Sequence, residues 1–160
     1  MGTEDRLKSI LRRQAAAVAL AAREDAEAKV ATETANQLRE SVTQKWKVQR
    51  AHFVKFIGQL NLQTSKNGVV LFVKESAYPA PVNASELDKV EVGFQRDVCE
   101  MRKLTISVRP DGKMHVTMTT RYTSPAKSYV LDALGATNDQ IEGTVLDFLD
   151  INTPAETGAA

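Results

Sequence analysis

The sequence predicts an α+β protein, with one long N-terminal α-helix of the coiled-coil kind followed by a small antiparallel β-sheet head and a C-terminal helix. Neither proline nor glycine occurs between Thr3 and Ile57. After Gly58, short segments alternate apolar and polar residues, and turn signals separate them. Apolar residues return to helical spacing near the C-terminus. We therefore expect a helical oligomerisation stalk over 1–58, a head over 59–152 and a flexible tail over 153–160.

The first helix is predicted by its composition. Strong helix formers fill residues 3–57, including eight alanines between positions 15 and 28. Thr3 suits the N-cap, and the acids at positions 4 and 5 suit the positive end of the helix dipole. Gly58 is the first residue that favours an end. Such a helix would be on the order of 80 Å long, far beyond a typical globular helix.

An apolar stripe runs along this helix in steps of three, four and seven residues, which predicts burial against another helix. No turn residue lies near the midpoint, so we do not expect the helix to fold back on itself. Alanines dominate the middle, which indicates a close but weak seam. We expect self-association, or pairing with a homologous subunit. The expected interface consists of Leu7, Leu11, Val18, Leu38, Val42, Trp46 and Phe53.

A basic segment lies near the predicted end of the helix. Between positions 41 and 66 there are cations but no acid. The candidate partner-binding patch consists of Lys45, Lys47, Arg50 and Lys55, interleaved with Trp46, His52 and Phe53. This mixture suits an acidic protein surface or a nucleic-acid backbone. The simpler interpretation, which we favour, is that the aromatic residues belong to the apolar stripe and the lysines solvate its flanks.

The head is predicted from alternation and turns. Val69–Val73 has the composition of a buried central strand, and Asn67-Gly68 is a two-residue turn signal. Residues 60–64 before it fit either a helix end or a short pairing strand. A loop is expected over 76–85, and a hairpin turn at 110–112. The alternating strands lie within 88–97, 104–108 and 114–119, and together they predict a sheet of three to five strands with one wet face.

The C-terminal helix is expected to cover the dry face of the sheet. Asn138 is the predicted cap, and Pro154 follows the predicted end. The expected apolar face consists of Ile141, Val145, Leu146, Phe148 and Leu149. The wet face carries an uncharged hydroxyl-rich strip that another subunit or a peptide could dock on, although threonine is also simply a good strand residue. This strip, with the arginine after it, consists of Thr105, Ser107, His115, Thr117, Thr119 and Arg121.

Catalysis is not predicted. Cys99 is the only cysteine, so it forms no disulfide within the chain. Together with His52 and His115 it gives only three ligands, whereas a Cys/His zinc site needs four. No nucleophile or carboxylate pair adjoins either histidine in the sequence. We expect no catalytic residue, no cofactor and no metal.

Charge is unevenly distributed. Residues 1–66 hold 12 Lys/Arg and 7 Asp/Glu, whereas residues 67–160 hold 9 and 13. The opposite signs suit either head-to-tail association or packing of two surfaces within the chain. Neither a secretory signal nor an apolar run long enough to cross a bilayer is recognisable. We expect an intracellular, cytoplasmic protein without membrane contact, or a nuclear one if the source is eukaryotic.

These features favour a non-enzymatic structural or adaptor subunit. It would oligomerise or pair through the long helix and present the head to a partner protein in a larger assembly. The first alternative is a nucleic-acid-associated protein that uses the basic segment Lys45–Lys55. The second is a non-catalytic accessory subunit of an enzyme complex.

Overall fold

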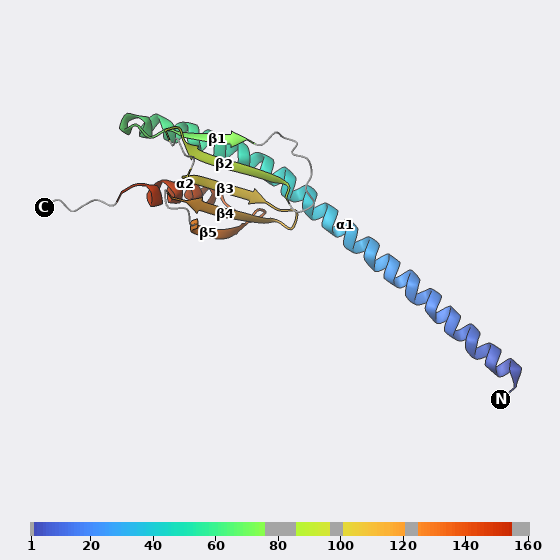
Figure 1. Cartoon of the computed structure of the whole chain (residues 1–160). Helices are drawn as coiled ribbons and strands as arrows, with labels where there is room; N and C mark the ends of the chain where they lie inside the picture. The colour runs from blue at the N-terminus through green and yellow to red at the C-terminus, as the bar shows by residue number, and fades with distance from the viewer. Residues whose placement is uncertain (1, 76–85, 97–100, 121–124, 155–160) are drawn as a thin grey trace. The chain divides into compact units, whose positions relative to one another are not determined.

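The computed structural model describes residues 2–75, 86–96, 101–120 and 125–154, and it has the predicted α+β class (Figure 1). The chain begins with helix α1 (Thr3–Thr64) and a short 3-10 turn, η1 (Ser65–Asn67). Five strands and a second helix follow. They are β1 (Leu71–Glu75), β2 (Asp88–Phe94), β3 (Lys103–Val108), β4 (Lys113–Thr119), β5 (Pro125–Asp132) and α2 (Asn138–Asn152).

The chain divides into two compact units, Met1–Gln37 and Leu38–Ala160. This boundary lies inside α1 rather than after residue 58, where the sequence analysis placed it. Helix α1 therefore contributes to both units. We call its first part, Thr3–Gln37, the N-terminal segment, and its second part, Leu38–Thr64, the packed segment.

The five strands form one antiparallel sheet in the order β1-β2-β3-β4-β5, so each strand pairs with its neighbours in sequence. Residues that face each other across paired strands share one face of the sheet. One such row runs through Val90, Ile106, Val116 and Tyr129. This face carries the buried side chains of the alternating pattern, as predicted. The packed segment and α2 both cover it (Figure 1).

The packed segment contributes a helical stripe to this core. Val42, Trp46, Phe53 and Ile57 are all at most 4% exposed, and they pack in one cluster with the covered face of the sheet. Their spacing of four and seven residues places them on one side of the helix. The stripe is therefore covered by the chain's own core rather than by a helix of another chain.

We expected helix α1 to end at Gly58, but it continues to Thr64. A single exposed glycine costs a helix only about 1 kcal/mol, and tertiary contacts beyond it offset that cost. Asn61 donates from Nδ2 to the Leu71 carbonyl at 2.8 Å and accepts from the Leu71 N–H at 2.9 Å. The Asn67-Gly68 pair ends the helix instead of turning a hairpin, because Gly68 adopts the left-handed conformation with φ 76°.

Helix α2 begins at Asn138, one residue earlier than predicted, because its cap is Thr137 rather than Asn138. Thr137 is the N-cap, and its hydroxyl accepts from the Gln140 N–H while the Gln140 side chain accepts from the Thr137 N–H, which makes a capping box. Phe148 lies on the inner side of α2, and its ring centroid is 5.1 Å from that of Phe94 on β2. Thr153 ends the helix where the sequence analysis placed the stop. Most of the predicted tail, 155–160, lies outside the described residues.

Candidate functional site

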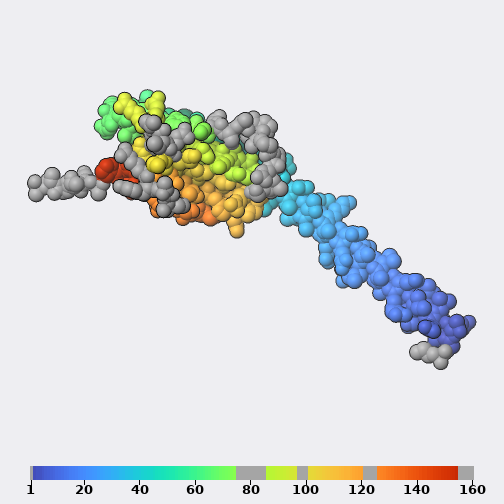
Figure 2. Space-filling view, in the orientation of Figure 1, coloured from blue at the N-terminus to red at the C-terminus, as the bar shows by residue number. Residues whose placement is uncertain are grey.

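The N-terminal segment is exposed along its whole length. Every side chain from Thr3 to Gln37 is solvent-exposed. Figure 2 shows one face of this segment in dark to light blue. Its large apolar side chains are Leu7, Ile10, Leu11, Val18, Leu20 and Val30, and Val18 is 70% exposed. Scattered apolar residues are normal on a protein surface, but an apolar row on an otherwise uncovered helix indicates an interaction site.

Three of these residues belong to one row. Leu7, Leu11 and Val18 follow one another in steps of four and seven, and Ala21, Ala28 and Ala35 extend the row in steps of three and seven. We call this row the alanine seam. Leu20 and Val30 lie off it. The seam has large side chains at its start and small ones towards its end.

The predicted interface residues therefore have different environments. Leu7, Leu11 and Val18 are exposed on the alanine seam, and Leu38 is half-buried beside the core. Val42, Trp46 and Phe53 are buried inside the Leu38–Ala160 unit, so a second chain cannot contact them without opening this core. The physical reason is that helical periodicity shows that a stripe is covered but not what covers it.

The predicted basic patch does not form one surface. Lys45, Lys47 and Lys55 are exposed, but Lys45 and Lys47 are two residues apart and so do not share a helix face. Arg50 is half-buried, and its Nη1 lies 3.1 Å from Oδ2 of Asp88. Trp46 and Phe53 are buried, so neither is available for stacking against a base.

Asp88 is the polar residue around which α1 meets β2. It is 2% exposed, and its Oδ2 accepts from Trp46 Nε1 at 2.7 Å as well as pairing with Arg50. Its Oδ1 accepts from the Lys89 N–H at 2.9 Å. A buried carboxylate with three donors is well satisfied, so this arrangement anchors the helix to the sheet. Sequence reasoning missed it because residues 46 and 88 are far apart in the chain.

Two further contacts join the packed segment to the C-terminal region. Gln49 Nε2 donates to the carbonyls of Ala133 and Ala136 at 3.0 and 3.3 Å. His52 Nε2 lies 3.2 Å from Glu142 Oε1 on α2, with both side chains half-buried. No carboxylate adjoins this histidine in the sequence, because His52 and Glu142 are 90 residues apart. The pair bridges two helices, and no nucleophile of the described chain is bonded to it.

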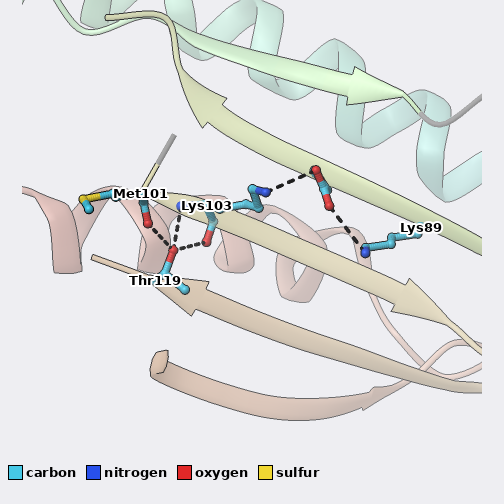
Figure 3. A network of polar contacts seen from close by, with 5 residues as sticks. Lys89, Met101, Lys103 and Thr119 are labelled. Carbon is cyan, nitrogen blue, oxygen red and sulfur yellow. Dashed lines mark hydrogen bonds and ion pairs between the residues drawn. The ribbon is translucent and has the colours of Figure 1, made fainter. Parts of the chain in front are cut away.

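The open face of the sheet carries the predicted hydroxyl strip. Thr105, Ser107, His115, Thr117 and Thr119 are all half-buried there, and Arg121 lies outside the described residues. Glu91 lies between Lys89 and Lys103, at 3.5 and 3.6 Å (Figure 3). The Thr119 hydroxyl donates to the Met101 carbonyl at 2.6 Å and accepts from the Lys103 N–H at 2.9 Å (Figure 3). These contacts tie the strands together and show no ligand-binding arrangement.

A cavity of about 630 Å³ lies beside Phe94, and its lining includes Arg96, Arg102, Thr120 and Pro154. Three of these residues directly adjoin segments that the structure does not describe: Arg96 precedes 97, Thr120 precedes 121, and Pro154 precedes 155. The cavity is therefore not bounded by described residues alone, and we assign it no ligand.

Titratable groups do not gather into a metal site in the described residues. Among the described residues, no group of three His, Cys, Asp or Glu side chains is placed to hold a metal ion, and Cys99 lies outside them. Burial raises the pKa of the Tyr129 phenol well above its ordinary value, and the Asp147 carboxylate, which accepts its hydrogen bond at 3.2 Å, adds to the rise. Tyr129 thus serves as a neutral hydrogen-bond donor to α2.

Within the described part of the chain, neither helix combines the length and the apolar character needed to traverse a bilayer.

Comparison with known proteins adds no relative: no family model, no curated protein and no solved structure matches this chain. The alanine seam of the N-terminal segment is the feature on which a functional argument can be built.

Proposed function

We propose that this protein is a non-enzymatic structural or adaptor subunit. It pairs through the N-terminal segment and presents its α+β head to a partner protein in a larger assembly. The uncharged strip on the open face of the sheet is the part of the head that we propose for that second contact.

The observation that carries this proposal is the exposed alanine seam. A lone helix of this length gains no tertiary packing, and helix stability in proteins comes mostly from burial of an apolar face. Leu7, Leu11 and Val18 give the seam the spacing that a second helix would cover. Because alanine buries little area, the gain per contact is small, and we expect reversible association.

The nucleic-acid alternative has weaker support. Its predicted patch has three exposed lysines spread around the helix, while Arg50 is paired with Asp88. The aromatic residues on which bases would stack are buried in the core. A role as an accessory subunit of an enzyme complex is a special case of the adaptor function, and no particular contact favours it.

Sedimentation equilibrium of Val18→Asp tests the proposal. We expect the wild-type chain to form a dimer or larger species at micromolar concentration, and Val18→Asp to shift it to monomer by placing a charge in the seam. Ala16→Asp is the matched control, because it adds the same charge two residues away on the opposite side of the helix. A wild-type chain that stays monomeric at every concentration would contradict the proposal, as would equal effects of the two variants.

A further inference from the structure

We infer that two copies of the N-terminal segment pair antiparallel, with Leu11 of one copy facing Ala28 of the other. This inference rests on the proposed function, since it specifies the partner and its orientation on the alanine seam. The occupant of the seam is a second copy of this chain.

The distribution of charge along the N-terminal segment favours the antiparallel orientation. Near its start the N-terminal segment is basic, with four cations and no acid between positions 6 and 13. They are Arg6, Lys8, Arg12 and Arg13. Near its end it is acidic, with four acids and one lysine between positions 24 and 33. The acids are Glu24, Asp25, Glu27 and Glu33. A parallel pair would place like charges side by side, whereas an antiparallel pair places each basic stretch beside an acidic one.

One register brings these stretches side by side. With Leu11 opposite Ala28, positions 6–13 of one copy lie level with positions 26–33 of the other. Arg12 and Glu27 lie on the outer sides of the helices, so the attraction acts between the two stretches as a whole rather than through paired side chains. Gln14 lies opposite Asp25, where the amide can donate to the carboxylate. Each pair occurs twice, because a symmetric dimer repeats every contact about its two-fold axis. That axis passes between Ala19 and Leu20.

The second argument is side-chain size. In the same register Leu11 meets Ala28, and Val18 meets Ala21, so large residues lie opposite small ones along the seam. Facing large and small side chains keep the distance between two helices even and leave no voids. A parallel pair would instead place Leu11 on Leu11 and Ala28 on Ala28, which separates the helices at one end and draws them together at the other.

Cysteine cross-linking measures the orientation directly. In a Cys99→Ser background, Leu11→Cys and Ala28→Cys chains are prepared separately and then mixed under mild oxidation. We expect the mixture to yield a disulfide-linked dimer that contains one chain of each kind, because facing Cβ atoms lie within bonding range. Each chain alone should yield little cross-linked product. Ala16→Cys, on the opposite side of the helix, is the control and should cross-link with neither.

Charge reversal gives an independent readout. Arg12→Glu with Arg13→Glu should weaken dimerisation in sedimentation equilibrium, because four acids then face two more. Adding Glu24→Arg and Glu27→Arg to the same chain should restore it, since the substituted positions of the two stretches then carry opposite charges again. The wild-type dimer should also weaken as salt is raised. These side chains are all exposed, so helix content by circular dichroism should stay unchanged.

The outcomes separate this inference from the proposed function. Self-linking of Leu11→Cys chains would show a parallel pair, which overturns the orientation but leaves pairing through the seam intact. A wild-type dimer that Val18→Asp dissociates, but in which no pair of cysteines links, also overturns the register proposed here. A chain that is monomeric throughout overturns both.

Discussion

The two parts of helix α1 carry similar apolar spacing but have opposite environments. In the packed segment Val42, Trp46 and Phe53 are buried in the chain's own core, whereas in the N-terminal segment Leu7 and Val18 are more than half exposed. The side chains on the stripe differ in kind. The packed segment uses aromatic and branched residues, which gain much from burial in a core, and the N-terminal segment uses mostly alanine. Residue size along a helical stripe thus separates a core helix from a seam better than spacing does.

The largest expected effect comes from Phe53→Ala. Phe53 is fully buried, so its truncation should lower the free energy of unfolding of the Leu38–Ala160 unit by about 3–5 kcal/mol through lost burial and a cavity. The matched change in the other part of the helix is Leu11→Ala, which should alter that free energy by less than about 0.5 kcal/mol. Urea unfolding followed by circular dichroism at low protein concentration measures both. Similar losses for the two variants would break the comparison between the two parts of the helix.

A somewhat smaller effect is expected at the buried carboxylate. Asp88→Ala removes the acceptor of Trp46 Nε1 and the partner of Arg50, which should destabilise the fold by about 3 kcal/mol. Asp88→Asn keeps an oxygen for the indole but not the charge, so its loss should be smaller. Urea unfolding of both, together with the fluorescence of the only tryptophan, tests whether this anchor holds the packed segment to the sheet. A neutral Asp88→Ala would refute the anchoring role.

Two glycines sharpen the description of where the packed segment ends. Gly58→Ala should stabilise the protein by about 0.5–1 kcal/mol, because no atom lies within 4 Å of the added Cβ and alanine favours the helix. Gly68→Ala should instead destabilise it by roughly 1 kcal/mol, since residue 68 has φ 76°. Thermal unfolding of the two variants distinguishes the opposite signs. A destabilised Gly58→Ala would indicate that the helix is interrupted there.

The smallest expected effect is a loss of stability that begins only at alkaline pH. The pKa of Tyr129 is raised in the folded state, so its contribution to stability is complete below its ordinary value of 10.0 and is lost as pH rises towards the higher folded value. Stability of the wild-type protein should therefore fall above about pH 10, and Tyr129→Phe should fall less. Urea midpoints measured between pH 8 and pH 11 test this difference. Parallel curves for the two proteins would show that Tyr129 is not responsible.

Local patterns in the sequence predicted most of the fold. Alternation identified the covered face of the sheet, because every second residue along a strand lies on the same face. Val92 on β2 and Ile106 on β3 each belong to such an apolar series. The absence of proline and glycine predicted one long helix, and its length was underestimated only because Gly58 was taken as an end. A single glycine is a weak signal when side chains beyond it, such as Asn61, bond to a strand.

Long-range contacts were beyond the reach of those patterns. Trp46 with Asp88 and His52 with Glu142 join residues 42 and 90 positions apart, and nothing local in the sequence marks such pairs. The uneven charge of the chain hinted at them. Part of it is used inside the molecule, where Arg50 of the acid-free stretch 41–66 meets Asp88 of β2. The candidate site could be predicted only in part. Leu7, Leu11 and Val18 are exposed and so available for pairing, whereas Val42, Trp46 and Phe53 are buried in the core.

The side chain of Asn61 has a consequence for how the sheet meets other chains. Val70 directs its carbonyl towards β2, where it accepts from the Gln95 N–H, so Leu71 directs its N–H and carbonyl away from the sheet. Asn61 occupies both of those groups, much as a neighbouring backbone would. The border of the sheet at β1 is thus closed at its first residue by an amide from α1, which discourages unintended strand addition there.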